Sequence, residues 1–138
     1  MNLSNYNTTD EARFLHLRHP SSNAKLFTGA DPKEPIGITL FGSDSARFRK
    51  AQHAQQTRRL SGASKRGRIK LRSEEIEADA TDLMVAVTES LHNVELDKPL
   101  ENSESNYRKL YDILWIRDQV DDFINERENY VGNSLTNS

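Results

Sequence analysis

Four histidines have the side chains best suited to metal binding or acid–base chemistry in this chain: His16, His19, His53 and His92. His16 and His19 are three residues apart in an expected strand, so their side chains point to opposite faces. The sequence contains no HExxH zinc motif, no glycine-rich phosphate loop and no GxSxG nucleophile motif. We therefore expect surface or capping histidines, no metal site and no cofactor.

Paired carboxylates are the other candidates for acid–base chemistry. Asp121 is next to Asp122, and Glu74 is next to Glu75. Adjacent residues in a helix point in different directions, so neither pair forms a dyad. The chain has no cysteine, which excludes a disulfide framework, a thiolate zinc site and a cysteine nucleophile. We expect a protein that is not an enzyme.

Charge is distributed unevenly along the chain. The net charge is −2, yet residues 47–72 carry ten Lys or Arg and no acid. From residue 73 to the end, five bases face sixteen acids. Such a distribution bears on partners and self-association more than on the fold. Its simplest interpretation is a solvated surface that pairs with the acidic half of the same molecule.

Two sharper interpretations of the basic segment concern partners. A nucleic-acid interface is one, although Phe48 is the segment's single aromatic residue and base stacking needs aromatic platforms. The other interpretation is a surface that binds another protein or the acidic half of a second copy. We favour this second interpretation. The partner-binding candidates in the segment are Arg47, Arg49, Lys50, Arg58, Arg59, Lys65, Arg66, Arg68 and Lys70. Tyr111 and Trp115 are the candidate apolar anchors, unless they complete the core.

The first third of the chain predicts a β-hairpin. Residues 12–19 alternate like a strand, and residues 20–35 are rich in turn formers, with a short strand as an option at 25–28. In residues 36–41, Ile36, Ile38 and Leu40 share one face at period two. Together these segments predict an antiparallel hairpin with one apolar face.

The rest of the chain predicts helices. Residues 44–60 form a basic helix capped by Ser43 or Ser45, and two glycines end it in a basic loop, 61–72. Ser73 caps the next helix. Its apolar positions are Ile76, Ala80, Leu83, Met84, Val87 and Leu91, which form one continuous face. Two further stripes follow after a cap at Ser103: Tyr107, Leu110, Tyr111 and Leu114, then Ile116, Val120, Phe123 and Ile124.

The expected fold class is α+β, with a small N-terminal antiparallel β-hairpin followed by a mainly helical domain of three to four helices. The parts of this single domain, 12–130, are a hairpin at 12–41, a basic helix at 44–60, a basic loop at 61–72 and a helical part at 73–127. A flexible arm, 1–11, and a flexible tail, 131–138, flank it. The start of the chain lacks the pattern of a signal peptide, and no apolar run reaches the roughly 20 residues of a membrane helix. We expect a soluble, cytoplasmic protein.

Two motifs give the chain a family resemblance. The strand-to-helix stretch "GSDSARFRKAQHAQQTRR" and the C-terminal stretch "WIRDQVDDFINERENY" stand in order with "FLHLRHP" and the basic loop between residues 12 and 133. In this arrangement the chain resembles the small tail assembly chaperones of long-tailed bacteriophages. Many of these proteins are mostly helical, so the N-terminal hairpin departs from the family pattern.

The resemblance implies a role without catalysis in the cytoplasm of an infected bacterial host. It implies binding to the long tape measure protein, which the chaperone keeps soluble, and recruitment of tail tube subunits. It also implies that a longer, frameshifted form can accompany a short one. Two alternatives remain: a structural tail or head–tail connector protein retained in the virion, and a nucleic-acid-binding regulator that uses residues 47–72.

Overall fold

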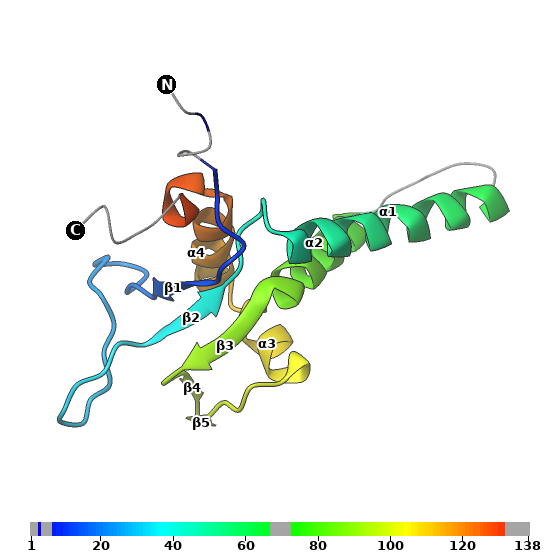
Figure 1. Ribbon diagram of the computed structural model, residues 1–138. Coiled ribbons are helices and arrows are strands. Elements are labelled where there is room, and N and C mark those ends of the chain that lie inside the picture. Colours follow the sequence, from blue (N-terminus) through cyan, green and yellow to red (C-terminus); the bar gives the residue numbers. More distant parts are fainter. Residues whose placement is uncertain (1–2, 4–6, 67–72, 132–138) are drawn as a thin grey trace.

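The chain folds as an α+β domain in the computed structural model, which confirms the expected class (Figure 1). The structure describes residue 3, residues 7–66 and residues 73–131, and of residues 62–66 and 73 it describes the backbone alone. The elements in chain order are β1 (Arg13–His16), β2 (Gly37–Leu40), α1 (Ala46–Arg66), α2 (Ser73–Val87), β3 (Thr88–His92), β4 (Glu95–Leu96), β5 (Lys98–Pro99), α3 (Glu104–Tyr111), α4 (Leu114–Asn125) and the 3₁₀ helix η2 (Arg127–Tyr130).

The expected hairpin is present, and a third strand extends it. β1, β2 and β3 form an antiparallel sheet in that order, with Leu15 opposite Ile38 and Ile38 opposite Leu91. Alternation along the strands places these three residues on one face and Phe14, Thr39 and His92 on the other. The first face packs on the helices.

β3 overturns one expectation. The apolar stripe from Ile76 to Leu91 predicts one helix, but α2 ends at Val87 and residues 88–92 are a strand. The β-branched Thr88 and the free edge of β2 favour strand pairing there, and tertiary pairing overrides the helical period. Ile76, expected in the core, is 54% exposed because the outer end of α2 extends away from the sheet.

The core lies between the sheet and the helices α2, α3 and α4. Its members with no exposed surface are Ile38, Leu40, Val87, Leu110, Tyr111 and Val120. Ser103 caps α3 as expected, since its hydroxyl accepts a hydrogen bond from the Asn106 amide. Leu114, expected in the stripe of α3, instead begins α4 and is 64% exposed.

The described residues of the expected N-terminal arm are not free. The Thr9 amide donates to the Tyr130 carbonyl at 2.7 Å, and Thr8 pairs with Val131 in an antiparallel bridge. The Asp10 carboxylate accepts a hydrogen bond from the Ala46 amide at 2.9 Å and so caps α1. Residues 7–11 therefore belong to the domain, and the expected tail, 132–138, lies outside the described residues.

Candidate partner-binding surface

Helix α1 carries the basic residues and extends past the edge of the sheet (Figure 1). The Ser45 hydroxyl, as expected, accepts a hydrogen bond from the Phe48 amide and caps its first turn. The helix was expected to end at Leu60, but it continues through Gly62 to Arg66. One glycine costs a helix about 1 kcal/mol relative to alanine, a cost that the surrounding helix can tolerate. The first six residues of the expected basic loop are thus helical.

Packing of α1 against α2 uses one predicted partner-binding residue. The Gln55 amide donates to the Asp79 carbonyl at 2.7 Å, and the Arg59 guanidinium forms an ion pair with the Asp79 carboxylate. Gln55 is buried and Arg59 is partly buried. Arg59 therefore holds the two helices together, in keeping with the interpretation that the basic segment pairs with the molecule's own acidic half.

The other described bases of α1 face solvent. Arg47, Arg49, Lys50 and Arg58 are all exposed. The Arg47 guanidinium lies over the Phe41 ring, 4.2 Å from its centroid. These four residues stay candidates for partner binding.

Four predicted residues cannot be placed in the surface. Lys65 and Arg66 belong to the last turn of α1, of which the backbone alone is described. Arg68 and Lys70 lie outside the described residues.

Tyr111, an expected apolar anchor, is part of the core. Its side chain is fully buried, and its hydroxyl lies 2.5 Å from the Thr88 hydroxyl. Burial raises the pKa of the Tyr111 phenol far above its usual range. It has no surface to offer a partner, so the prediction that it anchors one is wrong.

Trp115, the other expected anchor, lies in an apolar groove of about 310 Å³. The groove runs between the long loop of the β1–β2 hairpin, the segment around β4, and the junction of α3 with α4. Its apolar lining residues are Leu17, Leu26, Phe27, Ile36, Val94, Leu96, Leu110, Ile113, Trp115 and Ile116. Phe27 is 49% exposed at this site. Trp115 thus has the partly open, apolar setting that an anchor residue needs.

Sequence reasoning missed the walls of this groove. Phe27 and Leu26 lie in the turn-rich segment 20–35, which folds back on the strand because the Leu26 amide donates to the Leu17 carbonyl at 3.0 Å. The signal was present in "KLFT", which carries two large apolar residues in a loop. Val94 and Leu96 come after strand β3, which the helical pattern of the sequence did not predict.

Arginines of α3 and α4 bind α2, and Arg108 neutralises part of the acidic half. Arg108 forms ion pairs with Asp82 at 2.7 Å and with Glu104 at 3.0 Å. Arg117 donates to the Glu77 carbonyl and to the Thr81 hydroxyl, both at 2.8 Å. Within the described residues, the exposed Asp118 and Asp121 on the outer side of α4 form no ion pair.

Another ion pair fastens the turn before α1 to the 3₁₀ helix η2. The Arg127 guanidinium donates to the Asp44 carboxylate at 2.7 Å. This hydrogen bond is the main cause that lowers the pKa of Asp44. Asp44 is also positioned by Thr8, whose hydroxyl donates to it at 3.3 Å.

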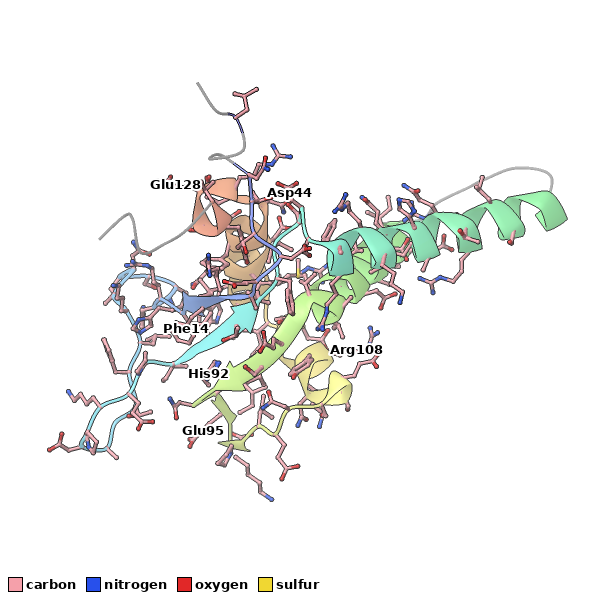
Figure 2. The ribbon with its side chains drawn as sticks, in the orientation of Figure 1. Phe14, Asp44, His92, Glu95, Arg108 and Glu128 are labelled. Carbon is pink, nitrogen blue, oxygen red and sulfur yellow. The ribbon has the colours of Figure 1, made fainter. Side chains whose placement is uncertain are left out.

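Three of the four histidines have structural partners. His16 Nε2 lies 2.7 Å from the Leu26 carbonyl, and His92 Nε2 lies 2.7 Å from the Thr39 hydroxyl. Phe14 packs edge-on against His92 on the same sheet face (Figure 2). His19 Nδ1 accepts from two amides of the following turn, which is the expected capping role. His53 is exposed on α1.

Within residues 7–66 and 73–131, no group of three or more His, Asp or Glu side chains is arranged to hold a metal ion. In the part of the chain that the structure describes, no helix has the length and apolarity to cross a membrane. No protein-family model, no curated protein and no solved structure matches the chain.

Proposed function

We propose that this chain is a tail assembly chaperone of a long-tailed bacteriophage. In this role it binds the tape measure protein in the host cytoplasm, keeps it soluble and helps recruit tail tube subunits, without catalysing a reaction. The observation that carries the proposal is the apolar groove beside Trp115, which offers a partner a place for large apolar side chains.

The groove suits one face of an amphipathic helix. Such a helix presents apolar side chains at intervals of three and four residues, and a hydrophobic groove takes them as a row of anchors. Aromatic residues near the centre of an interface commonly contribute most of its binding free energy. We therefore assign the groove to helical segments of the tape measure protein, with Trp115 and Phe27 as its aromatic contacts.

The sequence resemblance supports the choice of partner. Its two motifs, around Gly42 and around Tyr130, are 88 residues apart in the chain but lie side by side. A Cβ atom added to Gly42 would lie 2.9 Å from the Tyr130 ring. The motifs thus form one structural unit that positions α1 relative to α4.

The test is co-expression of the chain with the tape measure protein of the same phage, followed by purification from the soluble fraction. We expect the two proteins to purify together, and we expect Phe27→Asp to abolish the complex because it places a charge in the groove. Trp115→Ala should weaken the complex by removing the largest apolar side chain at this site.

Leu60→Asp is the matched control for Phe27→Asp. Leu60 is 63% exposed on α1, so the substitution also converts an exposed apolar residue to an acid, but away from the groove. Equal loss of the complex in both variants would show that the groove is not the binding site. A tape measure protein that stays insoluble, with this chain found in purified virions, would instead favour a structural tail protein.

A further inference from the structure

The outer side of α1 presents bases at regular intervals. Arg47, Lys50, Ala54 and Arg58 are all exposed. Their spacings of three and four residues place them along one side of the helix. We call this row the basic stripe. Among the described residues, neither Lys50 nor Arg58 has an ion-pair partner.

The outer side of α4 presents a row of opposite charge. Leu114, Asp118 and Asp121 are exposed and spaced by four and three residues, and the exposed Asp112 lies two residues before the helix. We call these four residues the acidic stripe. Within the described residues, none of its three acids forms an ion pair. Asp121 accepts a hydrogen bond from the Asn125 amide of the next turn.

The two stripes have the same spacing when the helices run antiparallel. Starting from Leu114, acids follow after four and seven residues; starting from Ala54 and reading backwards, bases follow after four and seven. A rise of about 1.5 Å per residue puts these charges about 6 Å and about 10.5 Å from the apolar position on both helices. When Ala54 of one helix lies opposite Leu114 of the other, Arg58 lies beyond the start of α4, on the side of Asp112.

We propose that the basic stripe of one molecule binds the acidic stripe of a second copy. Leu114 packs on the small Ala54, Lys50 meets Asp118, and Arg47 meets Asp121. Leu114 would leave water on binding, which explains an exposed leucine at the start of a helix whose other large apolar residues are buried or partly buried.

Because unlike stripes meet, a bound pair of copies still has one free basic stripe and one free acidic stripe. Contacts of this kind are head-to-tail, and they build rings or open rows rather than closed dimers. The association involves this chain alone, so its test is separate from that of the proposed function. A row of copies would also present a row of grooves, and linked sites bind a long partner more tightly than single sites.

The test is sedimentation velocity of the purified chain and of two charge-reversed variants. One variant carries Lys50→Glu and Arg58→Glu, and the other carries Asp118→Lys and Asp121→Lys. We expect the wild type to form assemblies that grow with concentration and dissociate in about 1 M salt, where the screening length is about 3 Å. Each variant alone should associate at least about tenfold more weakly, because each has lost one of its two stripes.

Mixing the two variants gives the decisive result. The intact acidic stripe of the first can bind the intact basic stripe of the second, so the mixture should form 1:1 heterodimers and stop there. Association of either variant as strong as that of the wild type, or a mixture that stays monomeric while the wild type associates, would overturn the proposal. A wild type that is monomeric at all concentrations would overturn it too.

Two controls separate stripe pairing from net charge and from misfolding. Lys33→Glu with Lys98→Glu changes the net charge as much as the α1 variant does, at exposed residues of the hairpin loop and of β5, and should leave assembly unchanged. Leu114→Ala removes most of the apolar contact without adding a charge, and alanine is the residue most favourable to a helix. It should weaken assembly while circular dichroism stays like that of the wild type.

Discussion

The hydroxyl of Tyr130 donates a hydrogen bond to the carbonyl of Leu40, 3.0 Å away, and so joins the last described helix to the end of the central strand. The Tyr130 side chain is 1% exposed, and its ring lies against Gly42. The Ser43 amide completes the junction by donating to the Ile124 carbonyl at 2.9 Å. The strand-to-helix turn is therefore shaped by residues near the C-terminus.

Replacing Tyr130 by Phe tests this junction. The ring would remain, but the Leu40 carbonyl would lose its buried donor, so we expect the free energy of unfolding to fall by about 1–2 kcal/mol. Urea denaturation measured for both proteins at pH 7 gives the difference directly. A variant as stable as the wild type would mean that water satisfies the carbonyl.

Alkaline pH should reduce that difference. Burial raises the pKa of Tyr130 well above its ordinary value near 10. A pKa raised in the folded state gives stability that is fully present below the unfolded pKa and is lost as the pH rises above it. The stability of the wild type should therefore fall above about pH 10 relative to Tyr130→Phe, which has no phenol to ionise.

Urea denaturation between pH 7 and pH 11 checks this expectation. Because all other titrating groups are common to both proteins, the difference between them isolates Tyr130. A difference that stays constant across this range would contradict a raised pKa.

The two glycines Gly42 and Gly29 should respond oppositely to alanine. A Cβ atom at Gly42 would lie 2.9 and 3.0 Å from carbons of the Tyr130 ring, so Gly42→Ala should cost about 1–3 kcal/mol of stability. At Gly29 nothing lies within 4 Å of the added atom, and Gly29→Ala should stabilise the fold by about 0.4–1 kcal/mol by restricting the unfolded chain. Thermal unfolding of both variants measures the contrast, and equal effects would refute it.

Local patterns were enough to predict the β1–β2 hairpin, the cap at Ser103 and the buried positions Ile116, Val120 and Ile124. Each depends on residues close together in the chain. Strand β3 was not predictable in this way, because Leu91 continues a helical stripe and becomes a strand residue only through its pairing with Ile38. That pairing joins residues more than fifty positions apart, so no periodic pattern within a short stretch of sequence indicates it.

The candidate site was predicted less completely than the fold. Trp115 was identified from its residue type, and the structure places it in a groove. Phe27 and Leu96, which also line that groove, come from a loop and a short strand that meet through tertiary packing. The exposure of the two aromatic candidates depends on tertiary packing: Tyr111 is fully buried in the core, whereas Trp115 packs against the core and stays partly exposed.

Neighbouring arginines of α1 should have different effects on stability. Arg59→Ala removes the ion pair with Asp79 between α1 and α2, and we expect a loss of about 1 kcal/mol. Arg58→Ala should change the free energy of unfolding by less than about 0.5 kcal/mol, because its side chain is exposed. Urea denaturation of both variants compares Arg59, which holds the two helices together, with Arg58, which lies at the surface. A larger loss at Arg58 than at Arg59 would contradict the assignment.

Trp115 is the single tryptophan of the chain, so its fluorescence reports on the groove without labelling. A helical peptide from the tape measure protein that fills the groove would exclude water from the indole. We expect its emission to shift to shorter wavelength and its quenching by acrylamide to weaken as the peptide is added. The Phe27→Asp variant, titrated in the same way, should show neither change because its charged groove rejects the apolar side chains. A peptide that binds by calorimetry while the emission and quenching of Trp115 stay constant would place the binding site elsewhere on the molecule.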